Sequence, residues 1–130
     1  MVLMIKQMFP SASRLLFYLI SPGPSGLKRA PRMDSLTVLV PVYNEEAVIG
    51  EFYRRTVDVC ETLEGTRFEL LFVDDGSSDR SIELVHDLIQ DDPRVSLLRL
   101  SRNFGKEAAL TAGLDHVDSD AVIIIDADLQ

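Results

Sequence analysis

Short apolar runs alternate with amphipathic segments over residues 34–130. The apolar runs are five or six residues long, typical of strands buried on both faces of a sheet; they are Thr37–Val42, Phe68–Val73, Val95–Leu100 and Ala121–Ile125. The segments between them place apolar residues three or four positions apart, which predicts helices. The first helix is expected to start at an Asn44 cap and end at Gly65, the second to have an apolar stripe from Ile82 to Ile89, and the third to run from Gly105 to about His116.

This order of strands and helices, joined by short connections, predicts an α/β fold. Its sheet should be parallel, with right-handed crossovers and helices on both faces. Polar clusters follow the strands, and they are Tyr43-Asn44-Glu45, Asp74-Asp75-Gly76, Arg102-Asn103 and Asp126-x-Asp128. Ligands of such sheets bind beyond the carboxyl ends of the strands, so four polar clusters at that edge predict one binding site.

Composition and charge argue against two classes of protein, disulfide-stabilised scaffolds and nucleic-acid-binding proteins. The chain has 130 residues, 46% of them hydrophobic, and a net charge of −8. A single cysteine, Cys60, excludes a scaffold held together by internal disulfides and favours a reducing compartment. The acidic balance argues against nucleic acid as the main partner, because phosphate binding needs a basic surface.

The first 33 residues differ in charge from the rest. They contain five basic residues and no acidic one, whereas residues 34–130 contain 8 basic and 21 acidic residues. Their apolar run, residues 15–20, is far shorter than the roughly 20 residues of a membrane-spanning helix. Three interpretations stay open: a disordered tail or an upstream-extended start with Met33 as the initiator, a membrane-surface segment, or an organellar transit peptide. We expect residues 1–33 and 34–130 not to form one packed unit.

Asp126 and Asp128 stand two positions apart at the end of a strand, so their side chains can point the same way. Two carboxylates without a nearby Cys or His suit a hard cation, Mg²⁺ or Mn²⁺, that leaves positions open for phosphate oxygens. The alternative is that Asp-x-Asp merely ends the strand in a turn.

Two further clusters have both a structural and a functional interpretation. Asp74-Asp75-Gly76 could be only a capped turn, or one carboxylate could accept hydrogen bonds from a base or a ribose; strand alternation favours Asp75 for that role. Arg102 and Lys106 could form a solvated basic turn or contact a diphosphate. The glycine motifs of NAD-binding Rossmann domains, P-loop NTPases and α/β-hydrolases are absent from the sequence.

Together the four blocks resemble the N-terminal half of a family 2 glycosyltransferase of the GT-A fold. In chain order they are Val40-Pro41-Val42-Tyr43-Asn44-Glu45-Glu46, Val73-Asp74-Asp75-Gly76-Ser77, Ser101-Arg102-Asn103-Phe104-Gly105-Lys106-Glu107 and Asp126-Ala127-Asp128-Leu129-Gln130. The spellings RNFGKE and DADLQ are most similar to the polyprenyl-phosphate branch, which includes dolichyl-phosphate mannosyltransferases and bactoprenol glucosyltransferases. The resemblance covers residues 36–130 and implies a Rossmann-like, nucleotide-sugar-binding half of a GT-A domain.

The resemblance also implies roles for individual residues. The residues assigned to the donor nucleotide and its phosphates are Pro41, Tyr43, Glu45, Val73, Asp75, Arg102 and Ala127. Asp126 and Asp128 would bind Mg²⁺ or Mn²⁺, with Gln130 as a further ligand. The catalytic residue stays unknown, because the resemblance places the acceptor half of the enzyme after the DxD motif.

The implied reaction is inverting transfer of a hexose from a UDP- or GDP-sugar to a polyprenyl phosphate. The full-length protein would act on the cytoplasmic side of a membrane, although this sequence contains no spanning segment. We expect the chain to be a fragment that ends after the DxD motif, with Val122–Ile125 left as an unpaired, aggregation-prone edge. The alternatives are a non-catalytic nucleotide-sugar-binding remnant and, more remotely, a receiver-like or phosphatase-like domain.

Overall fold

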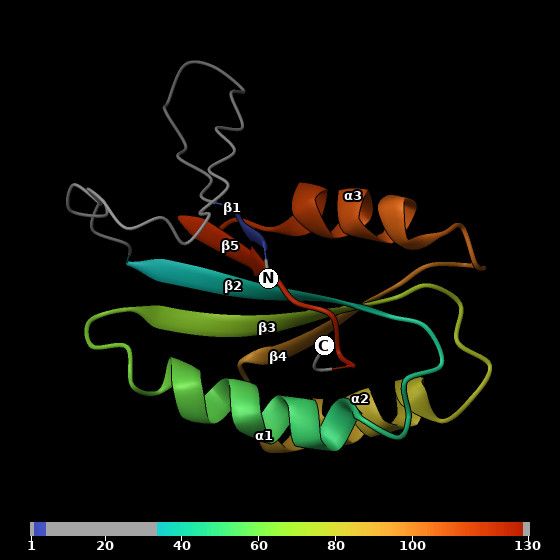
Figure 1. The fold of residues 1–130 in the computed structure, drawn as a ribbon, viewed down its shortest axis with the longest axis horizontal. Coiled ribbons are helices and arrows are strands. Elements are labelled where there is room, and N and C mark those ends of the chain that lie inside the picture. The colour runs from blue at the N-terminus through green and yellow to red at the C-terminus, as the bar shows by residue number, and fades with distance from the viewer. Residues whose placement is uncertain (1, 5–33, 129–130) are drawn as a thin grey trace.

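A computed structural model of the chain describes residues 2–4 and 34–128 and shows a sheet covered by helices (Figure 1). The elements, in chain order, are β1 (Val2–Met4), β2 (Ser35–Val42), α1 (Ile49–Cys60), β3 (Arg67–Asp74), α2 (Ser81–Asp91), β4 (Val95–Arg99), α3 (Lys106–His116) and β5 (Ala121–Ile124). The strands lie in the order β1-β5-β2-β3-β4. Strands β5, β2, β3 and β4 are parallel to one another. The predicted α/β fold with a parallel sheet is therefore confirmed.

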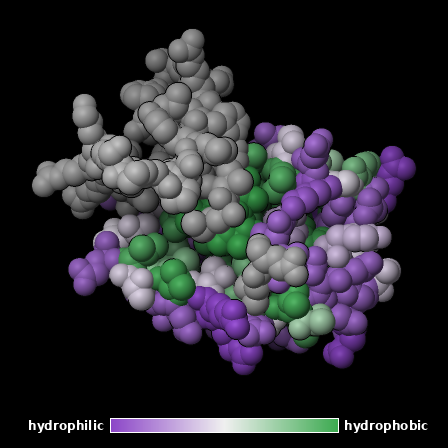
Figure 2. All heavy atoms as spheres, in the orientation of Figure 1, coloured by the Kyte–Doolittle hydropathy of each residue, from purple (hydrophilic) through white to green (hydrophobic). Residues whose placement is uncertain are grey.

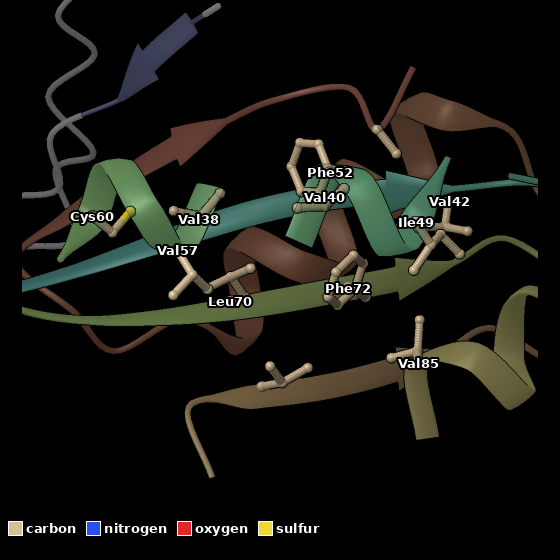
Figure 3. Packing of buried hydrophobic residues seen from close by; sticks show 12 residues of the cluster. Val38, Val40, Val42, Ile49, Phe52, Val57, Cys60, Leu70, Phe72 and Val85 are labelled. Atoms are coloured by element: carbon tan, nitrogen blue, oxygen red, sulfur yellow. The ribbon is translucent and has the colours of Figure 1, made fainter. Parts of the chain in front are cut away.

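Both faces of the sheet are buried, as the continuous apolar runs predict. Figure 1 shows α3 on one face and α1 and α2 on the other. Side chains alternate along β2, so Val38 and Val40 pack toward α1 while Leu39 packs toward α3. On the α1 side, the rings of Phe52 and Phe72 meet edge to face with 6.3 Å between centroids (Figure 3).

The close approach of α3 to the sheet depends on a small residue. A Cβ atom at Gly113 would lie 2.5 Å from Leu39 Cδ1 and 2.9 Å from Val73 Cγ2. Any larger side chain would force Leu39, Val73 or α3 itself to shift. The small residues Ala109 and Gly113, the two buried positions of this helix, are thus explained by packing.

The start of the first helix differs from the sequence prediction. α1 begins at Ile49, and Asn44 lies outside it with a positive φ of 51°. The Asn44 Oδ1 atom instead accepts hydrogen bonds from the backbone N–H groups of Ser78 (2.9 Å) and Asp79 (3.3 Å). The prediction of an Asn44 cap is wrong because this side chain binds a neighbouring loop, which a local pattern does not reveal.

The end of that helix also differs, since α1 stops at Cys60 and Gly65 lies in the following turn with a φ of 74°. The other two helices match more closely. Asp79 Oδ1 accepts a hydrogen bond from the N–H of Ser81, the first residue of α2. α3 starts directly after Gly105 and ends at His116, as predicted.

The expectation that Val122–Ile125 forms an unpaired edge is wrong. β5 is parallel to β2 on one side, and on the other side it pairs with β1 in an antiparallel register that places Leu3 opposite Ile123. The expected separation of residues 1–33 from the domain therefore fails for Val2–Met4. The interpretations of the remaining leader concern residues 5–33, which lie outside the described residues.

The outer surface combines polar and apolar areas. Figure 2 shows hydrophilic residues over much of the visible face, with hydrophobic residues gathered near its middle. Among the residues that the structure describes, none of the helices is long and apolar enough to cross a membrane.

Candidate functional site

The polar loops meet at the carboxyl edge of the sheet, where a pocket of about 280 Å³ opens. The loops after β2, β3 and β4 lie together at the right of Figure 1. The described residues that line the pocket are Pro41, Tyr43, Glu45, Asp75, Asn103, Gly105, Lys106, Ala109, Asp126 and Asp128. All four clusters predicted from the sequence contribute to it.

The loop after β2 is held in place by the loop after β3. The backbone N–H of Asn44 donates to Ser77 Oγ at 2.9 Å, and that of Glu45 donates to Ser81 Oγ at 2.9 Å. These bonds, together with the Asn44 side chain, fix Tyr43 and Glu45 at the mouth of the pocket. The Tyr43 ring stays about half exposed, at 49%, and offers a flat apolar surface there.

The two adjacent aspartates at the end of β3 have different partners. Asp74 Oδ2 accepts hydrogen bonds from Gly76 and Ser77 N–H and shapes the turn. Asp75 lines the pocket, as the alternation along the strand predicts, although its ligand stays a prediction.

Asp75 also holds the loop that precedes α3. Its Oδ1 accepts from Phe104 N–H at 2.8 Å, and its Oδ2 accepts from Gly105 N–H at 3.0 Å. The loop comes so close that a Cβ at Gly76, whose φ is 82°, would lie 2.5 Å from the Asn103 nitrogen. Both the carboxylate and the glycine are therefore needed for this arrangement.

Negative charge dominates the pocket. Burial raises the pKa of the Glu45 carboxyl above its ordinary value, and the charges of Asp128 and Asp126 raise it further. Lys106 acts in the opposite direction and lowers it. The Lys106 ammonium lies 2.6 Å from Asp126 Oδ1, so it partly neutralises the DxD segment.

The residues present fit a hard divalent cation. Asp126 already pairs with a positive group, and the charges of Asp128 and Asp126 add to the effect of burial in raising the pKa of Glu45. Within residues 2–4 and 34–128, no set of three His, Cys, Asp or Glu side chains is close enough to hold a metal. One or two carboxylates together with phosphate oxygens are the usual ligands of Mg²⁺ in such sites. The proposed metal contact of Gln130 falls outside the described residues.

Three predicted nucleotide-binding residues do not line the pocket. The side chain of Val73 is 0% exposed and packs in the core, and that of Ala127 is 1% exposed. Val73 lies on β3 and Ala127 lies in the turn after β5, and their assignment to the nucleotide stays a prediction. Arg102 is exposed and its guanidinium stacks 4.6 Å from the centre of the Phe104 ring.

The residues assigned to the donor omitted four lining residues, Asn103, Gly105, Lys106 and Ala109, although Lys106 was one of the two candidates for a diphosphate contact. A signal was present, because the first three belong to the RNFGKE block. Ala109 follows Lys106 by one helical turn, which places both on the same side of α3.

The chain is similar in sequence to known proteins over most of its length. Residues 37–130 match the family model described as Glycosyl transferase family 2. The chain is 50% identical over 94 residues to the uncharacterized glycosyltransferase YkcC of Bacillus subtilis, covering 72% of this chain and 29% of that protein. It is 44% identical over 102 residues to the undecaprenyl-phosphate 4-deoxy-4-formamido-L-arabinose transferase of Salmonella paratyphi B, covering 78% of this chain and 31% of that protein.

A solved structure is also similar to this chain in fold and in sequence. The mannosyltransferase PcManGT of Pyrobaculum calidifontis, in complex with GDP-Man and Mn²⁺, superposes with a TM-score of 0.63 and 30% sequence identity. The match covers 75% of this chain and 28% of that one. The chain thus spans about three-tenths of the length of the proteins that it matches.

Proposed function

Because this chain belongs to glycosyltransferase family 2 and has a GT-A fold, we propose that its pocket binds the nucleoside diphosphate of a sugar donor together with Mg²⁺ or Mn²⁺. The observation that supports this most strongly is the convergence of Tyr43, Asp75, Asp126 and Asp128 on one pocket. The Mn²⁺ and GDP-Man bound by the mannosyltransferase neighbour support it as well.

Each group in the pocket has a chemically suitable role in donor binding. The exposed Tyr43 ring can stack on a nucleobase, beside Pro41. Asp75 already accepts one backbone hydrogen bond on each oxygen, and each oxygen keeps a lone pair for a base N–H or a ribose hydroxyl. Asp126 and Asp128 would hold the cation, which neutralises charge on the departing diphosphate.

The proposed reaction is inverting transfer of a hexose from a UDP- or GDP-sugar to a polyprenyl phosphate. An oxygen of the acceptor phosphate forms a bond to the anomeric carbon, and the bond from that carbon to the nucleoside diphosphate breaks. A phosphate monoester is already an anion, so a strong general base is not required. The undecaprenyl-phosphate transferase among the relatives supports this acceptor. The proposal includes action of the full-length protein at the cytoplasmic side of a membrane.

A second candidate is a module that binds nucleotide-sugar without transferring it. It is favoured by the pocket itself, since the roles proposed for its described residues concern the donor and none concerns an acceptor. The two candidates differ in one result: only the first transfers labelled sugar to undecaprenyl phosphate.

The donor proposal is tested by calorimetric titration of the chain with UDP and GDP, with and without Mn²⁺. We expect one of the nucleotides to bind only when Mn²⁺ is present. Asp128→Asn should weaken that binding by at least about tenfold, because it removes a charge that holds the cation. Asp58→Asn, an exposed residue of α1, is the matched control and should change nothing. Equal binding without Mn²⁺, or equal binding by Asp128→Asn, would refute the proposed role of the DxD segment.

A further inference from the structure

Acidic side chains outnumber basic ones among the described residues that line the pocket. Among its described lining residues, Glu45, Asp75, Asp126 and Asp128 are acidic and Lys106 alone is basic. Asp75 is engaged with two backbone N–H groups, and Lys106 pairs with Asp126 at 2.6 Å. The ammonium therefore occupies one oxygen of the same carboxylate that is proposed to bind the cation.

The backbone at Lys106 is held in place, whereas its side-chain ammonium can move. Lys106 is the first residue of α3, and the N–H of the preceding Gly105 is bound by Asp75. By contrast, the side chains of Lys106 and Asp126 are 57% and 45% exposed. An ion pair this exposed is weakly held and can be exchanged for another partner.

Building on the proposed donor site, we propose that Lys106 acts as a placeholder for the cation. In the absence of ligand its ammonium neutralises Asp126. When the cation and donor bind, the ammonium leaves Asp126 and contacts the diphosphate. Both steps follow from charge: the cation and the ammonium compete for Asp126, whereas a diphosphate attracts both.

This arrangement has a signature that a merely structural lysine would not produce. Lys106 should oppose the binding of a cation alone and favour the binding of a nucleoside diphosphate with the cation. Removing its charge should therefore shift the two affinities in opposite directions.

The test compares the wild-type chain with Lys106→Met, which keeps the length of the side chain. Binding of Mn²⁺ alone is followed by electron paramagnetic resonance, and binding of UDP and GDP at saturating Mn²⁺ by calorimetry. We expect Lys106→Met to bind Mn²⁺ alone about two- to fivefold more tightly, the range of an exposed ion pair, and to bind the nucleotide more weakly by a similar factor.

Two controls accompany this variant. Arg55→Met removes the same charge from an exposed ion pair with Glu51 on α1 and should alter neither affinity. Lys106→Arg keeps the charge, so its two affinities should shift less than those of Lys106→Met.

The outcomes separate the two proposals. Equal Mn²⁺ affinity in the wild type and in Lys106→Met, or a loss of both affinities, overturns the placeholder role while the donor site stands. Absence of nucleotide binding at saturating Mn²⁺ in both proteins overturns the proposed donor site and this inference with it.

Discussion

At the scale of single residues, Asp75 shows how one side chain serves two purposes. Its carboxylate lines the pocket and also binds the backbone of Phe104 and Gly105. The position of the loop before α3, and hence of Lys106, therefore depends on an acid at the end of a different strand. Sequence alternation indicates which aspartate faces the pocket, but it does not reveal the bonds to the loop.

Substitution of Asp75 by Asn should loosen this loop. The amide keeps one acceptor and turns an NH₂ group toward one backbone N–H, which should cost roughly 1–3 kcal/mol in the free energy of unfolding. Hydrogen exchange measured by NMR should become faster at the amides of Phe104 and Gly105. Asp87→Asn, an exposed residue of α2, serves as the control. Unchanged exchange at both amides would show that the Asp75 carboxylate does not hold the loop.

At the scale of elements, Asp92 joins three of them at the opposite edge of the sheet. It is 5% exposed, accepts a 2.6 Å hydrogen bond from Tyr53 of α1, and pairs with Arg94, which lies 2.9 Å away just before β4. The Arg94 guanidinium also stacks 4.4 Å from the centre of the Phe68 ring on β3. These contacts connect α1, β3 and the start of β4.

The stability of the chain should depend on pH through Asp92. Hydrogen bonds from Arg94, and then from Tyr53, hold the pKa of the Asp92 carboxyl well below its usual value of 3.8. An acid with a lowered folded pKa stabilises the fold at pH values above its unfolded pKa, and this contribution is lost as the pH falls toward the folded pKa.

Asp92→Asn should therefore lower the free energy of unfolding by about 1.5–3 kcal/mol at pH 7, and the deficit should shrink below about pH 4. Chemical denaturation at a series of pH values measures both effects. The exposed neighbour Asp91 provides the control, since Asp91→Asn should change stability by less than about 0.5 kcal/mol. A deficit that stays constant down to pH 3 would contradict the assigned role of the charge.

At the scale of the whole molecule, the first residues of the chain close one side of the sheet. β1 covers the outer side of β5 and so removes a strand edge that would otherwise be open. The charge difference between residues 1–33 and the rest favours separate units, yet β-pairing depends on backbone hydrogen bonds that net charge does not describe.

A chain that starts at Met33 should therefore self-associate more than the 130-residue chain, because it lacks β1 and exposes the edge of β5. Sedimentation velocity over a range of concentrations measures this. Ile123→Lys in the shortened chain is the matched control, and the charge on the edge strand should restore the monomer. If the shortened chain without this substitution is as monomeric as the 130-residue chain, β1 does not protect β5.

The sequence by itself determined the layers of the fold and most of the site. Apolar runs buried on both faces require a parallel sheet with helices on each side, and the polar residues after each strand must meet at its carboxyl edge. Tyr43, Glu45, Asp75, Asp126 and Asp128 were found in this way, since their position at strand ends depends on local pattern alone.

Only the tertiary structure decided which groups contact one another across that edge. Three of these contacts join residues of different elements. They are the hydrogen bonds of Asn44 with the β3–α2 loop, the hydrogen bonds of Asp75 with the loop before α3, and the ion pair of Lys106 with Asp126. The pairing of β1 with β5 likewise joins distant segments. Such contacts depend on how elements pack in space, and the spacing of residues along the chain leaves that open.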